Sequence, residues 1–85
     1  MFEITENDIN LIVDDSKVGY ILYEEKEDCL VGTYIYVIPE EREKGYSSLL
    51  IERFVELSKE RNKLIVPTCP VIKGYIEAKY SEILK

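Results

Sequence analysis

Residues 37–50 read V-I-P-E-E-R-E-K-G-Y-S-S-L-L and mark the point at which the apolar pattern of this chain changes its period. Before this stretch, apolar residues alternate with polar ones as in half-buried strands, and after it they recur at helical spacing. A second stretch, residues 64–75, reads L-I-V-P-T-C-P-V-I-K-G-Y. It predicts a short buried strand that stops at Pro67 and is followed by a helix. The two stretches together predict the order strand, loop, helix, strand, helix.

The residues before Val37 predict an antiparallel meander. Ile9, Leu11 and Val13 alternate with residues 10, 12 and 14, the period-2 pattern of a half-buried strand, and Asp14–Lys17 is a turn cluster. β-Branched and aromatic residues favour extended structure in the later segments. Strands are therefore expected over residues 9–13, 18–23 and 29–37, with 2–4 as a short preceding edge strand.

The residues after Val37 predict two amphipathic helices. The apolar positions of the first helix fall on one face; they are Tyr46, Leu49, Leu50, Phe54 and Leu57. Lys59, Arg61 and Lys63 follow near its end, where cations suit the helix dipole. The second helix is expected to begin near Pro70, and its apolar face is expected to carry Ile72, Tyr75, Ile76, Tyr80 and Ile83.

These elements predict the fold class. The segment that joins the strand ending at Val37 to the strand 64–66 is long enough for a right-handed parallel crossover. The expected fold is α+β, with a mixed, mostly antiparallel sheet of four or five strands, one βαβ unit and two flanking helices. All 85 residues are expected to form a single domain.

Composition and charge argue against several classes of function. The formal net charge of −6, with no run of Lys or Arg, argues against nucleic-acid binding. No apolar stretch is long enough to span a bilayer, and the first residues do not resemble a signal peptide, so a cytoplasmic location is expected. The chain has no histidine, and its two cysteines, Cys29 and Cys69, are far apart in the sequence. This argues against both a zinc site and a disulfide framework.

The loop before the first helix has the chemistry of a phosphate site. The N-terminus of a helix presents unpaired backbone N–H groups and a partial positive charge. Gly45 permits a close approach of a ligand to the backbone, and Arg42 and Lys44 add cations to an acidic protein. The alternative is a solvated strand-to-helix turn with scattered charges.

Cys69 lies where the second strand ends and the second helix begins. The dipole of a helix favours a thiolate at its N-terminus and makes it more nucleophilic. The alternative is that Cys69 is a small buried apolar residue, which is the commoner role of a free cysteine.

The pattern V-x-P-E-x-R-x-x-G-x-S, followed by a helix and by V-P-x-C-P-x-x-x-x-Y-I, resembles the GCN5-related N-acetyltransferases. More narrowly, it resembles their minimal single-domain branch, and the resemblance covers roughly residues 13–80. It implies that Arg42, Gly45 and Ser47 occupy the three positions of the family's loop motif. The backbone amides of this loop would hold the pyrophosphate of acetyl-CoA. The cofactor-binding residues implied are Val37, Arg42, Glu43, Lys44, Gly45, Tyr46, Ser47 and Ser48.

The same resemblance implies roles in acetyl transfer. Main-chain groups of the strand ending at Val37 would polarise the acetyl carbonyl, Cys69 would lie near the thioester, and Tyr75 would protonate the departing thiolate. The chain departs from the branch at three positions. Glu43 and Ser47 stand where glycines are usual, and Tyr34 stands where a histidine is common.

Two hypotheses follow. The first is an N-acetyltransferase that moves an acetyl group from acetyl-CoA to an unidentified amine, through Cys69 or by direct attack of the amine. The second is a non-catalytic module on the same scaffold, which binds CoA or acyl-CoA or interacts with a protein.

Overall fold

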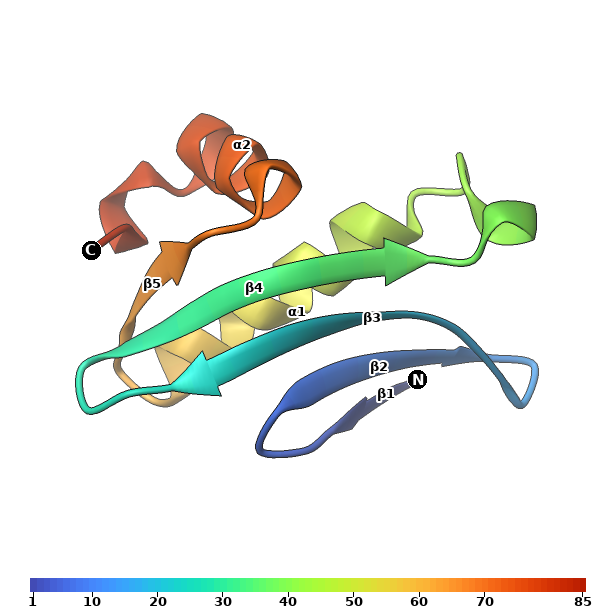
Figure 1. The fold of residues 1–85 in the computed structure, drawn as a ribbon, viewed down its shortest axis with the longest axis horizontal. Helices are drawn as coiled ribbons and strands as arrows, with labels where there is room; N and C mark the ends of the chain where they lie inside the picture. The colour runs from blue at the N-terminus through green and yellow to red at the C-terminus, as the bar shows by residue number, and fades with distance from the viewer.

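The computed structural model describes every residue from Met1 to Lys85. One five-stranded sheet, in the order β1-β2-β3-β4-β5, carries two α-helices (Figure 1). The strands are β1 (Phe2–Ile4), β2 (Asp8–Val13), β3 (Ser16–Glu25), β4 (Cys29–Val37) and β5 (Leu64–Pro67). The helices are α1 (Tyr46–Glu60) and α2 (Pro70–Lys79), with 3-10 turns η1 (Pro39–Glu41) and η2 (Ser81–Ile83). The predicted α+β class is confirmed.

β1 to β4 form the predicted antiparallel meander, and β4 and β5 are parallel across the α1 crossover. The β2–β3 hairpin turns on Asp14 and Asp15, which both have positive φ, of 50° and 64°. This is the conformation of a tight hairpin turn, and aspartate tolerates it well. β3 is longer than predicted at both ends: Ser16 and Lys17, expected in the turn, pair with Val13 and Ile12 of β2. Glu24 and Glu25 pair with Val31 and Leu30 of β4.

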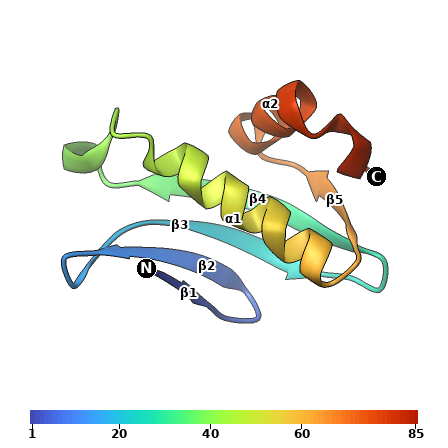
Figure 2. The same cartoon turned by 180° about the vertical axis from the view of Figure 1, so that it is seen from behind.

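α1 covers one face of the sheet (Figure 2). Its buried residues are Leu50, Ile51, Phe54, Val55, Leu57 and Ser58. The prediction that Leu49 lies on the buried face is wrong, because 48% of it is exposed. The stripe that faces the sheet runs through adjacent pairs such as 50/51 and 54/55, and Leu49 projects beside it.

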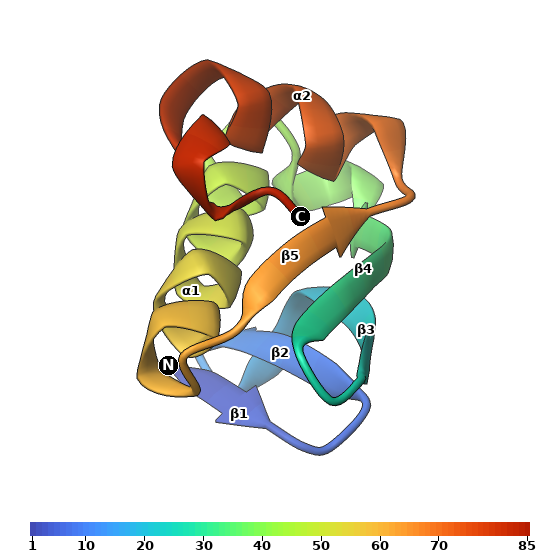
Figure 3. The same ribbon diagram turned by 90° about the vertical axis from the view of Figure 1, so that its left-hand side faces the viewer.

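α2 begins at Pro70 as predicted, but it is shorter than the apolar pattern indicated. Tyr80 leaves the helical conformation, with φ −139° and ψ 43°, so Tyr80 and Ile83 follow α2 instead of continuing it. Ile83 is still buried, and Ile65 of β5 bridges to Leu84. Figure 3 shows the C-terminus beside β5, with α2 above it. Tertiary contacts of the chain end therefore replaced the last helical turn.

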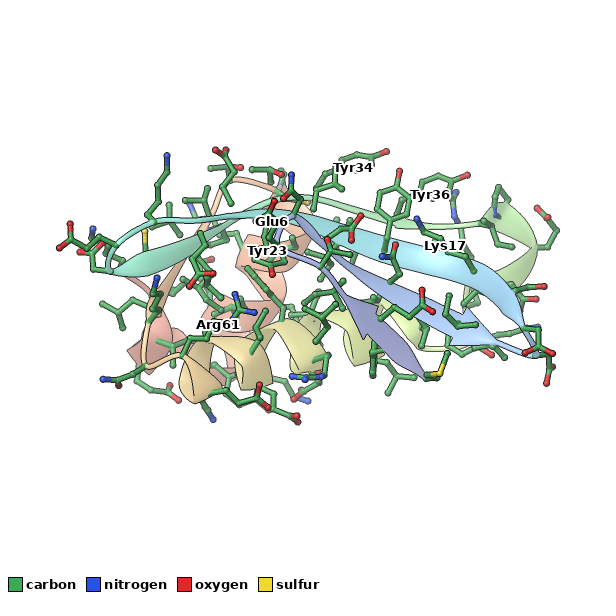
Figure 4. The ribbon with its side chains drawn as sticks, turned by 90° about the horizontal axis from the view of Figure 1, so that it is seen from below. Glu6, Lys17, Tyr23, Tyr34, Tyr36 and Arg61 are labelled. Atoms are coloured by element: carbon green, nitrogen blue, oxygen red, sulfur yellow. The ribbon has the colours of Figure 1, made fainter.

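The face of the sheet opposite α1 carries no helix. Tyr20, Tyr34 and Tyr36 pack there, with the Tyr20 ring centroid 6.2 Å from that of Tyr34 and 5.7 Å from that of Tyr36. Tyr34 and Tyr36 point away from α1 (Figure 4). Their predicted place on a sheet face is confirmed. Neither α1 nor α2 has the length and apolar character that crossing a membrane requires.

Candidate functional site

The site begins where β4 and β5 separate. β5 pairs with β4 only from Cys29↔Leu64 to Gly32↔Pro67, and β4 then continues alone on that side to Val37 (Figure 1). Pro67 has no N–H to donate, which helps to end the ladder. The amide of the next residue, Thr68, donates to the Gly32 carbonyl at 2.9 Å. We refer to this separation of β4 and β5 after Gly32 as the fork.

A β-bulge in β4 coincides with the fork. Leu22 of β3 pairs with Tyr34, whereas the next residue, Tyr23, pairs with Gly32, so Thr33 is an extra residue in β4. A bulge bends its strand and increases the local twist. β4 therefore changes direction at the point where β5 leaves it.

The edge of β4 beyond the bulge offers free backbone groups. The Ile38 amide donates to the Val18 carbonyl at 2.9 Å, so residues 38, 36 and 34 direct their backbone groups to β3. Ile35 and Val37 direct theirs to the opposite side, where β5 is no longer paired. Arg42 Nε donates to the Val37 carbonyl at 2.8 Å. The amides of Ile35 and Val37 and the Ile35 carbonyl have no strand partner on that side.

A cavity of about 530 Å³ lies beside this free edge. Its lining comes from three elements: Tyr34, Ile35, Tyr36 and Val37 of β4; Glu41, Arg42, Glu43, Gly45, Tyr46 and Ser47 of the following segment; and Val71 of α2. The cavity thus joins the free edge of β4 to the N-terminus of α1. Ile35 and Val71 were not predicted from the sequence to belong to the site. Ile35 could have been predicted, because it lies two residues before Val37 in the same strand and therefore faces the same side.

The end of the cavity near α1 is rich in unpaired donors. No backbone amide from Glu43 to Ser48 donates a hydrogen bond within the protein, and no side chain caps α1. Gly45 has φ 81°, and a Cβ built on it would meet nothing within 4 Å. Tyr46, Ser47 and Ser48 belong to the first helical turn, which contains no acidic residue. This arrangement suits an anion, because the amides and the helix dipole act together.

The charged side chains of the loop differ in their positions. Arg42 lines the cavity, bonds to Val37 and lies over the Tyr36 ring, at 5.5 Å from its centroid. Lys44 is absent from the lining and pairs with Glu41 at 2.6 Å, a bond that raises the pKa of Lys44. Glu43 lines the cavity with φ 67°, a left-handed conformation. The end of the cavity near α1 therefore contains one cation, Arg42, and two carboxylates, of which Glu41 is paired with Lys44 and Glu43 is not.

Cys69 and Tyr75 are not among the residues that line the cavity. Cys69 is the N-cap residue of α2, half-buried against the hydrophobic core. The Tyr75 hydroxyl donates to Glu52 Oε2 of α1 at 2.5 Å. The roles predicted for Cys69 and Tyr75 in acetyl transfer therefore stay predictions. To reach a substrate in the cavity, Tyr75 would have to break its hydrogen bond with Glu52.

Glu52 is the centre of a polar cluster that the sequence did not reveal. Tyr75 and Tyr80 both donate to its carboxylate, and Lys79 lies 3.7 Å from it. The Tyr75 hydrogen bond, followed by that of Tyr80, holds the pKa of Glu52 below its usual value. The same carboxylate raises the pKa of Tyr80. This cluster joins α1 to the C-terminal segment and lies outside the cavity.

The model of the family described as GCN5-related N-acetyl-transferase matches residues 2–83. The chain belongs to this family. No curated protein matches it.

Solved structures of N-acetyltransferases share the fold. A GCN5-like protein of Staphylococcus aureus is 19% identical, with a TM-score of 0.78, over 100% of this chain and 87% of that one. The ribosomal-protein-alanine N-acetyltransferase of Brucella melitensis biovar Abortus is 21% identical, with a TM-score of 0.69, over 92% of this chain. A predicted acetyltransferase of Clostridium acetobutylicum, solved with acetyl-CoA, is 15% identical, with a TM-score of 0.62, over 86% of this chain. The chain spans only 59% and 55% of the latter two proteins.

Proposed function

We propose that this member of the family transfers an acetyl group from acetyl-CoA to an amine. The observation that carries the proposal is that a single cavity is lined both by the unpaired amides at the N-terminus of α1 and by the free edge of β4. A diphosphate suits the first part, and an extended amide-containing chain ending in a thioester suits the second. The neighbour that was solved with acetyl-CoA supports the choice of ligand.

The loop supplies binding in this proposal. The amides from Glu43 to Ser48 would donate to the diphosphate oxygens, and Gly45 would allow them to approach the backbone closely. Arg42 would add a charge-assisted contact, and Lys44 would contribute at longer range while it remains paired with Glu41. Val37 and Ile35 would orient the thioester through their outward amides, because an N–H aimed at the carbonyl oxygen stabilises the charge that develops there.

The acetyl group would move by one of two routes. In direct transfer the neutral amine attacks the acetyl carbonyl, the C–N bond forms and the C–S bond breaks; the nitrogen gives up one proton and the CoA thiolate takes one, so the products are the amide and the CoA thiol. In the relay route the Cys69 sulfur attacks first, CoA leaves and the amine then displaces Cys69. Tyr75 is the proposed proton donor to the thiolate. Because the cavity lining does not include Cys69, direct transfer needs fewer rearrangements.

Thermal-shift titration with CoA tests the binding site. Gly45→Asn is the informative variant, since asparagine tolerates positive φ and fills the open space over Gly45. We expect its affinity for CoA to fall by about tenfold or more, a loss of about 1.4 kcal/mol or more. Its melting temperature without ligand should stay close to that of the parent. Equal CoA affinity in the two proteins would contradict the assignment of the loop.

Intact mass spectrometry after incubation with acetyl-CoA separates the two routes. One added acetyl group that is absent in Cys69→Ala supports the relay. Turnover of a model amine by Cys69→Ala, with no adduct on the parent, supports direct transfer. A Tyr75→Phe variant that retains the parent's kcat would remove Tyr75 from the mechanism.

A second candidate function is non-catalytic binding of CoA or acyl-CoA. The observation that favours it is that neither predicted catalytic residue lines the cavity, and that the Tyr75 hydroxyl donates to Glu52 instead. Stabilisation by CoA without consumption of acetyl-CoA, for any amine offered, would support this function.

A further inference from the structure

The tyrosines on the uncovered face of β3 and β4 form a row in which two rings already hold a cation. Lys17 Nζ lies 4.7 Å from the ring centroid of Tyr20, and Arg42 lies over Tyr36. Tyr34 belongs to the same row and has no cation over its ring, although it is 47% exposed. Figure 4 shows Tyr34 and Tyr36 projecting from the same face of the sheet. Tyr34 is therefore the one tyrosine of the row without a cation over its ring. The cations over Tyr20 and Tyr36 show that this face of the sheet accommodates positive charge.

Tyr34 also lines the cavity, at the end opposite the α1 amides. It is the cavity residue of β4 nearest the fork, and Val37 is the one nearest the loop. At about 3.3 Å per residue, the two positions are about 10 Å apart along the strand. A thioester whose diphosphate lies at the loop would extend toward Tyr34.

The charges around the cavity favour a cationic ligand near Tyr34. None of the cavity residues of β4 is charged, and Arg42, the one cation in the lining, is held at the loop end by Val37 and Tyr36. The whole chain carries a net charge of −6. A ring face and a negative field together attract an ammonium group.

We propose that Tyr34 binds an ammonium group of the acceptor that is not the group to be acetylated, so that the preferred acceptors carry two amines. This inference rests on the proposed acetyl transfer. The reacting nitrogen must lose its proton before it attacks, so the attacking nitrogen does not keep a charge for Tyr34. A second ammonium on a short aliphatic spacer keeps its charge and stays over the ring while the first reacts.

The binding part is tested by NMR of the tyrosine rings in the intact chain. The probes are cadaverine, a capped di-lysine peptide and pentanol, which has a similar length to cadaverine and no charge. Tyr34→Phe assigns the Tyr34 ring signals by their disappearance. We expect saturable shifts of the Tyr34 signals with an ammonium probe and none with pentanol. The ammonium probe that saturates at the lower concentration distinguishes a free diamine from a basic peptide. Shifts centred on other tyrosines, or equal shifts with pentanol, would overturn the proposal.

The specificity part is tested by steady-state acetylation of cadaverine and of pentylamine. Because cadaverine has two equivalent amines, kcat/KM is compared per amine group, and on this basis the parent should favour cadaverine by about two- to fivefold, the range of an exposed cation–π contact. Tyr34→Leu should lose this preference and Tyr34→Phe should keep it, with CoA affinity unchanged in both. An unchanged preference in Tyr34→Leu would overturn the role of Tyr34. If the parent does not bind CoA at all, the proposed function is refuted. A saturable shift of the Tyr34 signals in that case would define a cation site that has no role in acceptor binding.

Discussion

At the scale of single residues, Glu43 is in conflict with both its conformation and its surroundings. Four non-glycine residues have positive φ: Asp14, Asp15, Glu43 and Asn62. Aspartate and asparagine tolerate this region through short polar side chains, but glutamate does not share that advantage. Glu43 also brings a carboxylate to the cavity end where amides and Arg42 favour an anion. The backbone of Glu43 is therefore strained, and its carboxylate would repel a negatively charged diphosphate.

Replacing Glu43 by glycine should improve stability and CoA affinity together. Relief of the left-handed strain, less the extra entropy of glycine in the unfolded chain, should raise the free energy of unfolding by about 0.5–1 kcal/mol. Removal of a like charge at contact distance is worth roughly 1 kcal/mol in water, so CoA should bind about fivefold more tightly. Urea unfolding and CoA titration measure the two effects.

Asn62→Gly is the matched control, since Asn62 has φ 56° and does not line the cavity. It should leave CoA affinity unchanged. A Glu43→Gly variant that gains stability but not affinity would show that the carboxylate does not face the ligand.

At the scale of elements, Glu52 attaches the C-terminal segment to α1. Its carboxylate accepts hydrogen bonds from Tyr75 of α2 and from Tyr80, which follows α2. α2 is a short helix, and isolated helices of this length are marginal in water. The cluster and the buried residues Ile72 and Ile76 therefore hold α2 in place.

The contribution of this cluster should depend on pH. The folded pKa of Glu52 lies below the ordinary value of 4.5, chiefly because of the Tyr75 hydrogen bond. A lowered pKa stabilises the fold above the ordinary value, and this stabilisation is lost as the pH falls through the folded pKa. Glu52→Gln should therefore be less stable than the parent at neutral pH, and the difference should shrink below pH 4.5. Urea unfolding at several pH values measures it.

Glu56→Gln is the control for this prediction. Glu56 lies one turn further along α1, and its partner Arg53 is 3.3 Å away, outside the Glu52 cluster. This variant should show a much smaller difference from the parent at neutral pH, because exposed ion pairs contribute little. A Glu52→Gln difference that stays constant across the acid range would refute the assigned role of the carboxylate.

At the scale of the whole molecule, Gly32 brings together the sheet and both helices. It is the last residue of β4 that pairs with β5, and its carbonyl accepts the Thr68 amide. A Cβ on Gly32 would lie 2.9 Å from the Phe54 ring of α1 and 3.4 Å from Ile72 of α2. The close packing of both helices against β4 at the fork thus depends on the absence of a side chain at Gly32.

Gly32→Ala should lower the free energy of unfolding by about 1–3 kcal/mol, because the added methyl group forces Phe54 out of its packed position. Gly74→Ala is the matched control: Gly74 is exposed in α2 and has nothing within 4 Å of a built Cβ. That change should raise the free energy of unfolding by about 0.5–1 kcal/mol through helix propensity. Urea unfolding of both variants is the measurement, and equal effects of the same sign would contradict the packing argument.

The sequence by itself determined the order of elements, the α+β class and the family. These features depend on residues close together in the chain: alternation in β2, β-branched and aromatic residues in β3 and β4, helical spacing in α1, and Pro70 at the first position of α2. The loop motif from Arg42 to Ser47 is equally local. Local periodicity and short-range motifs are therefore sufficient to predict them.

Only the tertiary structure decided the shape of the site. The bulge at Thr33 depends on the pairing register between β3 and β4, and the fork after Gly32 depends on the register between β4 and β5, which the α1 crossover separates in the sequence. The contact of Arg42 with Val37, the attachment of Tyr75 to Glu52 and the exposure of Leu49 also follow from how elements meet. Such contacts are chosen by packing and by hydrogen-bond partners that local propensity does not encode.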